Sequence, residues 1–251
     1  MRSFSWERMS LFTPRFVELI SARTWPHLQG LSASSYDDNS DLSKVIGAMQ
    51  RIADLKVRKY SFYIRADGSL RPHLSNLQTL DLYEAIAFTS ELAQEVMSSC
   101  PLLTVFKGCI VDAVDIVQGR PWVCLQLKLL SLGFRFDSTT FDQMHPLVLD
   151  QLSRLTRLED LELYSWRQSP SQFQETIDLR LEHGLGKLST LRLLRILEIG
   201  AAKQRMGLQE IDWMIEHWKC LVRIYGKLNV VEAEVEKTLG ERLRQRGIAN
   251  Y

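Results

Sequence analysis

The chain has 251 residues, of which 45% are hydrophobic and 24% are charged, which is ordinary for a soluble folded protein. Its 31 Lys and Arg residues against 30 Asp and Glu residues give a net charge of +1, which excludes a generally basic surface for nucleic acid or an anionic membrane. No stretch approaches the ~18 consecutive apolar residues that a membrane span requires.

The spacing of the cysteines and the N-terminal sequence indicate the cellular compartment. The four cysteines are scattered and form no Cys-x-x-Cys pair, so the sequence indicates neither a disulfide framework nor a zinc site. Glu7 and Arg8 interrupt the chain before any apolar run forms, so no secretory signal is predicted. We therefore expect a cytoplasmic or nuclear protein.

One apolar phrase, Leu-x-x-Leu-x-Leu, recurs along the whole chain. Strong copies start at Leu77, Leu127, Leu158 and Leu194, and weaker copies start at Leu28, Val57, Leu103 and Leu221. The steps between copies run from 20 to 36 residues, which is the spacing of repeat proteins. The last three residues of each phrase alternate apolar, other, apolar, and this period predicts a short strand with one buried face.

Helical spacing of apolar residues appears between the phrases. The patterns predict helices over 13–23, 41–52, 89–101 and 208–220, with Thr89 or Ser90 as a cap for the third. In the fourth, the inward residues are Leu208, Ile211, Met214, Ile215 and Trp218. A last helix over 230–247, with acidic residues first and arginines last, is predicted to cap the array, with partner binding as the alternative.

Strand, loop and helix thus alternate, and each unit buries its apolar side only against its neighbours. The expected fold is α/β: a single solenoid domain over 1–251 with about eight irregular repeats. Parallel strands would line the concave face of a curved horseshoe, and helices the convex face. Polar segments after Leu132 and Leu163 are interpreted as insertions in two of the units.

The segment 77–103 resembles the cysteine-containing class of leucine-rich repeat. Cys100, Pro101 and Leu103 match its Cys-Pro-x-Leu junction between a helix and the next strand, and only Asn229 keeps the Asn of its loop position. The chain is similar over roughly 14–230 to the repeat region of F-box proteins, although no F-box is visible. The resemblance implies a protein-interaction scaffold that recognises substrates for a cullin-type ubiquitin ligase.

Two other functions are weighed against this one. The first is a stand-alone leucine-rich-repeat binding protein with no link to ubiquitin. The second, more remote, is an enzyme, but no nucleophile, base and orienting group can be named together. The five histidines, His27, His73, His145, His183 and His217, are expected to be solvated or hydrogen-bonded, and Cys109 and Cys124 to be buried. The sequence predicts no cofactor and no metal site.

The strand phrases also predict which side chains face a partner. If Leu80 and Leu82 point into the core, Thr79, Asp81 and Tyr83 point to the concave face. The same offset in the other units gives the remaining candidates for partner binding, namely Tyr63, Lys107, Asp160, Glu162, Tyr164, Glu198 and Tyr225. The middle position of successive phrases is mixed in sign and leans acidic in the later units, so a protein partner is expected and nucleic acid is not. A merely solvated face is the alternative.

Overall fold

The computed structural model describes residues 3–7, 28–34, 41–58, 68–82, 88–163, 177–200 and 204–251. Ten strands form one open sheet, in which the strands lie in chain order and every neighbouring pair is parallel. The strands are β1 (Ser3–Glu7), β2 (Gly30–Ser34), β3 (Asp54–Arg58), β4 (Thr79–Asp81), β5 (Val105–Asp112), β6 (Leu129–Arg135), β7 (Asp160–Leu163), β8 (Ile196–Gly200), β9 (Arg223–Gly226) and β10 (Ala249–Asn250).

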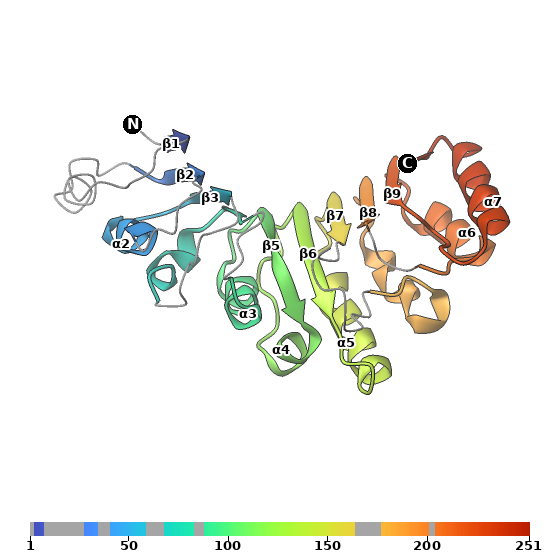
Figure 1. The fold of residues 1–251 in the computed structure, drawn as a ribbon, viewed down its shortest axis with the longest axis horizontal. Coiled ribbons are helices and arrows are strands. Elements are labelled where there is room, and N and C mark those ends of the chain that lie inside the picture. Colours follow the sequence, from blue (N-terminus) through green and yellow to red (C-terminus); the bar gives the residue numbers. More distant parts are fainter. Residues whose placement is uncertain are drawn as a thin grey trace.

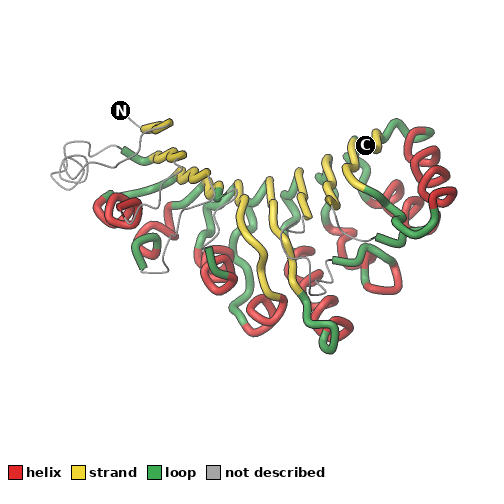
Figure 2. Tube along the Cα trace, in the orientation of Figure 1, coloured by secondary structure: helices red, strands yellow, loops and turns green. Residues whose placement is uncertain are grey.

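From β2 onward, helical segments connect successive strands. They are the α-helices α2 (Asp41–Ala48), α3 (Ser90–Ser99), α4 (Ala113–Gln118), α5 (Phe141–Ser153), α6 (Leu208–His217) and α7 (Ala233–Arg244), and the 3₁₀ helices η1 (Arg71–Asn76), η2 (Leu181–His183) and η3 (Leu185–Thr190). The strands line the inner side of a curved array and the helices line its outer side (Figures 1 and 2). The array curves this way because a helix is ~10 Å wide, whereas neighbouring strands are only ~4.8 Å apart.

The recurring apolar phrase coincides with the strands. In seven of its eight copies a strand begins two residues after the first apolar residue, as at Leu77 and Thr79. The first and fourth residues of the phrase are buried in all seven of these copies, between the sheet and the helical layer. The core is therefore one continuous apolar layer to which each unit contributes the same positions.

The predicted phrase at Val57 was wrong by five residues. The strand of this unit is β3, and its Asp54 pairs with Thr79, so the phrase begins at Ile52. Ile52, Leu55 and Val57 are all fully buried. The letters IADLKV and VRKYSF both fit the apolar pattern, and only the pairing with β4 distinguishes them.

The predicted helices are confirmed where the structure describes them. Thr89 is the N-cap of α3, and its hydroxyl accepts a hydrogen bond from Leu92 N at 3.3 Å. In α6 the predicted inward residues are buried or half-buried, except Leu208, which is exposed. The helix predicted over 13–23 lies outside the described residues.

Several elements were not predicted. Strands β1 and β10 extend the sheet at its two ends, and helix α5 lies in a segment interpreted as an insertion. The C-terminal helix α7 has the predicted charge order, with Glu234 and Glu236 first and Arg242 and Arg244 last. It is not the last element, because β10 follows it and pairs with β9. That the chain is a single domain stays a prediction.

Buried amide side chains join neighbouring units on the outer side. The amide of Gln94 donates to Arg120 O at 2.7 Å and accepts from the Trp122 indole at 2.8 Å. Gln204 donates to Ile177 O at 2.7 Å and accepts from Leu179 N at 3.0 Å. Because buried backbone groups must be paired, these side chains hold irregular connections that a sheet cannot satisfy.

Asn229 has the same role at the C-terminal end. Its amide donates to Met206 O at 3.0 Å, and its oxygen accepts from Val231 N and Glu232 N, both at 2.9 Å. The Asn singled out by the sequence thus fixes the loop after β9 to the preceding unit.

Candidate functional site

The inner face of the sheet carries the side chains that point away from the helices. In β4 to β9 these are the first and third residues of each strand, and the pairing register aligns them in two rows across the array. The first row is Thr79, Val105, Leu129, Asp160, Ile196 and Arg223, and the middle row is Asp81, Lys107, Ser131, Glu162, Glu198 and Tyr225. We call these twelve side chains the inner face.

Seven of the ten predicted partner-binding residues belong to this inner face. They are Thr79, Asp81, Lys107, Asp160, Glu162, Glu198 and Tyr225, and the register brings them together. Tyr63, Tyr83 and Tyr164 lie outside the described residues. In the unit of β3, Lys56 pairs with Asp81 and so continues the middle row.

An ion pair crosses the centre of the middle row. Lys107 Nζ on β5 lies 3.2 Å from Glu162 Oε1 on β7, so the pair spans the intervening strand β6. The residue beneath it on β6 is Ser131, which is 1% exposed. Strands two apart are separated by ~10 Å, and two long side chains can close that distance only over a small residue. Ser131 therefore permits the contact between Lys107 and Glu162.

Carboxylates outnumber cations on this part of the sheet. Burial, and next the charge of Glu162, raise the pKa of Glu198, while Lys107 lowers it. Burial, followed by Glu159 and Glu162, raises the pKa of Asp160, while Arg195 and Lys107 lower it. Removal from water and like charges both disfavour the ionised form. A cationic group placed here would relieve both effects.

An aromatic pair borders the carboxylates on the C-terminal side. Tyr225, next to Glu198 in the register, stacks on Tyr251 with ring centroids 5.4 Å apart and planes 20° from parallel. Arg223 Nη1 donates to the Tyr225 hydroxyl at 3.3 Å. Tyr251 was missed by sequence reasoning, because only the pairing of β10 with β9 brings it to this face.

The first row gives the face its apolar component. Val105, Leu129 and Ile196 are half-buried, and Asp160 lies between the last two in the register. Apolar side chains that neighbour charged ones, with a tyrosine pair at one end, have the mixed composition of a protein-binding surface.

Two of the described thiols, Cys100 and Cys124, are buried and are not candidates for a reactive cysteine, whereas Cys220 is exposed. Burial raises the pKa of both Cys100 and Cys124 to about 12, and Cys124 contacts Met97 Sδ at 3.6 Å. The prediction that Cys124 is buried is confirmed, whereas the side chain of Cys109 lies outside the described set. A thiol with a raised pKa is not a nucleophile at neutral pH.

Two of the predicted hydrogen-bonded histidines are buried. His73 Nε2 lies 3.0 Å from Ile46 O, and His145 contacts backbone groups through both of its ring nitrogens. In the described ranges, no group of three or more His, Cys, Asp and Glu residues is arranged to hold a metal ion.

Two comparisons with known proteins find no relative. No protein-family model matches the sequence, and a search of curated proteins finds no significant match. No helix within the described segments is long and apolar enough to cross a membrane.

Proposed function

We propose that this chain is a leucine-rich-repeat protein whose inner face binds a segment of another protein. The repeat class is supported by the constant offset between phrase and strand. With the corrected start at Ile52, all eight phrases place a parallel strand two residues after their first apolar residue. This constancy is what a solenoid of leucine-rich repeats requires, because each unit packs only against its neighbours.

The row of partly desolvated carboxylates on the inner face is the observation that carries the binding proposal. Asp160, Glu162 and Glu198 lie on neighbouring strands, and only one cation, Lys107, is bonded to them among the described residues. A side chain such as Arg or Lys on a partner would complete the charge balance. Tyr225 and Leu129 would supply the apolar contact that makes such an interface stable.

Charge reversal on the inner face tests the proposal. The protein would be purified from its own cells, with its partners, as wild type and as Glu162→Lys/Glu198→Lys. We expect the double variant to retain its principal partner at least about tenfold less well, because two attractive charges become repulsive. The measurement is quantitative mass spectrometry of the co-purified proteins.

A matched variant controls for the change in net charge. Glu234 and Glu241 are exposed on α7, on the outer layer, so Glu234→Lys/Glu241→Lys adds the same charge elsewhere. This control should keep the partner. If the inner-face variant keeps the partner while its thermal midpoint equals that of the wild type, the inner face is not the binding surface.

A narrower proposal is that the partner is a substrate of a cullin-type ubiquitin ligase. Its support is the junction after α3, where buried Cys100 caps the helix and Leu103 N donates to Cys100 O at 3.2 Å before β5 begins. This is the junction that resembles the F-box relatives. If ligase components are absent from the purified wild-type complex, the narrower proposal fails and the broader one stands.

A further inference from the structure

Cations gather at one edge of the array, next to the inner face. Because all strands are parallel, the connections that lead from a helical segment into the next strand lie at the same edge. Residues 154–159, 191–195 and 218–222 form three consecutive connections of this kind. We call them the connection edge. It carries five cations, Arg154, Arg157, Arg192, Arg195 and Lys219.

These cations form no close ion pair with the described acidic residues, although Arg195 is near enough to Asp160 to lower the pKa of that carboxyl. Glu159 is the sole carboxylate within the three connections, and its Oε1 is already 3.1 Å from Lys128 Nζ. None of the five cations forms a salt bridge with any residue the structure describes. Elsewhere in the described chain some cations form salt bridges, namely Arg71, Lys107, Arg135, Arg180, Lys187 and Arg242, and others, such as Lys56, Arg205 and Lys237, form none with described residues.

Helix capping gives a structural role to only two of the five cations. Lys219 Nζ donates to Ile215 O at 3.3 Å near the end of α6, and Arg154 contacts Gln151 at the end of α5. A cation near a helix C-terminus is stabilising, so these two have a structural role. Arg157, Arg192 and Arg195 are exposed and make no such contact within the described chain. They are the cations left to bind a partner.

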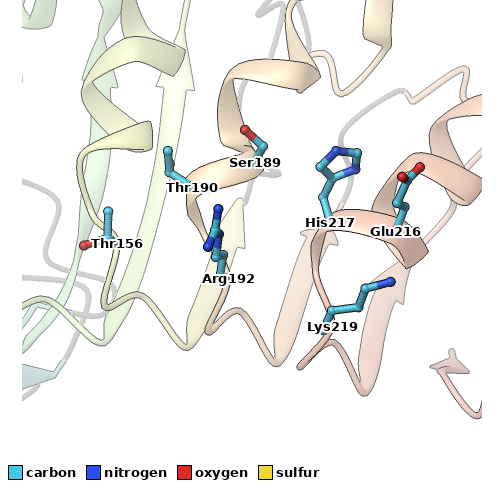
Figure 3. A pocket seen from close by; sticks show the side chains of 7 residues that line it. All are labelled: Thr156, Ser189, Thr190, Arg192, Glu216, His217 and Lys219. Carbon is cyan, nitrogen blue, oxygen red and sulfur yellow. The ribbon is translucent and has the colours of Figure 1, made fainter.

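The connection edge is also hollowed. A pocket of about 850 Å³ opens between the three connections, and Arg192, Lys219 and His217 line it together with hydroxyl groups. Figure 3 shows Arg192 standing between Thr156 and Thr190 on one side and His217 on the other. Glu216 lies on the same rim and is the one carboxylate lining the pocket. Guanidinium, ammonium and hydroxyl groups around one hollow are donors suited to carboxylate oxygens.

Exposed apolar side chains distinguish among anionic partners. Leu193 is 46% exposed and directly follows Arg192, and Val222 is 41% exposed at the end of the third connection. Single-stranded nucleic acid binds through stacked aromatic rings, and the aromatic ring in these connections, Trp218, is only 1% exposed, so it offers no surface for stacking. Proteins bind a lipid bilayer through protruding surfaces, whereas the connection edge has a pocket. Carboxylates next to leucine-like side chains fit it better.

We infer that the connection edge binds an acidic, leucine-bearing segment of a partner protein, independently of the inner face. Its carboxylates would face Arg192 and Arg195, and its apolar side chains would cover Leu193 and Val222. The test is fluorescence anisotropy with a labelled peptide of repeated Glu-Glu-Leu units, a Gln-Gln-Leu peptide of equal length, a single-stranded oligonucleotide and anionic lipid vesicles.

We expect wild type to bind the Glu-Glu-Leu peptide in preference to the other three probes, with an affinity that falls as salt is added. Arg192→Glu/Arg195→Glu should weaken it about tenfold or more, and Glu216→Gln should strengthen it severalfold. Lys237→Glu, an equally exposed cation on α7, should change nothing, nor should the inner-face variant Glu162→Lys/Glu198→Lys.

Three results would overturn the inference. They are equal binding of the Gln-Gln-Leu peptide, unchanged binding by the double Arg variant with intact circular dichroism, or preferred binding of the oligonucleotide or the vesicles. The inner-face variant separates this site from the proposed function, because each surface is tested by charges that the other does not contain.

Discussion

Replacing Trp218 with Ala should lower the free energy of unfolding by about 3–5 kcal/mol. Trp218 is 1% exposed at the end of α6, and its indole Nε1 donates to Leu188 O at 2.9 Å in the preceding unit. The substitution would leave a large cavity between two units and a buried carbonyl without its donor. Urea unfolding followed by circular dichroism measures the loss.

Leu208 offers a control on the same helix. The sequence predicts that Leu208 and Trp218 share the inward side of α6, yet Leu208 is 48% exposed. Leu208→Ala should therefore change the free energy of unfolding by no more than about 0.5 kcal/mol. Equal losses for the two variants would contradict the packing described for this helix.

Acid should destabilise the protein through His145. The ring is buried against Phe141, with centroids 4.7 Å apart, and it makes two backbone contacts. The geometry suits a neutral ring whose Nδ1 donates to His183 O at 3.1 Å and whose Nε2 accepts from Asp178 N at 3.0 Å. Protonation of Nε2 would place a second N–H donor opposite the backbone N–H of Asp178, and the hydrogen bond between them would be lost.

Burial lowers the pKa of His145 from 6.5 to about 4, although Asp178 raises it in part. Between these values the unfolded chain binds more protons than the folded one, so stability falls as the pH falls. Near pH 4 the free energy of unfolding has fallen by about 3 kcal/mol, because the pKa of His145 differs this much between the folded and unfolded chain. The stabilisation is fully present above the unfolded pKa.

The measurement is the free energy of unfolding of wild type and His145→Gln between about pH 7 and pH 5. Asp142, Asp178 and His183 also surround this ring, so the difference between the two proteins isolates His145. We expect the wild type to lose about 2 kcal/mol more than the variant over this interval. Parallel pH profiles would show that His145 is not held neutral by the fold.

Much of the strand arrangement could be predicted because every strand must bury the same pattern of apolar residues. Each strand must bury two apolar residues at a period of two, so LQTLDL and LEDLEL marked β4 and β7 correctly. The unit of β3 was misplaced because two overlapping phrases satisfy the same demand. Pairing register, which chooses between them, is a property of neighbouring strands and not of local sequence.

Elements outside the Leu-x-x-Leu-x-Leu phrases were missed because their stability comes from contacts with neighbouring elements. β1 and β10 gain their stability from pairing with a neighbour, and β10 has only two residues. Helix α5 contains Pro146, which removes a backbone donor from the helix interior. Helix α5 packs on α4 and η3, and this packing compensates for the missing hydrogen bond. The local sequence of α5 gives no sign of these contacts.

The candidate site was predicted in part. Alternation along the strands placed Lys107, Glu162 and Glu198 on one face, but it could not show that Ser131 lets Lys107 reach across a strand to Glu162. Tyr251 joins the face only through β10. The cations of the connection edge carry a sequence signal, since Arg154 and Arg157, and Arg192 and Arg195, recur three residues apart before successive strands.

The central claim is that the inner face is the surface that meets the partner, and site-specific photo-cross-linking tests it most directly. A benzophenone amino acid would replace Leu129, at the centre of the inner face, or Lys237, on the outer helix α7. We predict that the co-purified partner is cross-linked from position 129 and not from position 237. Cross-linking from position 237 alone would contradict the account.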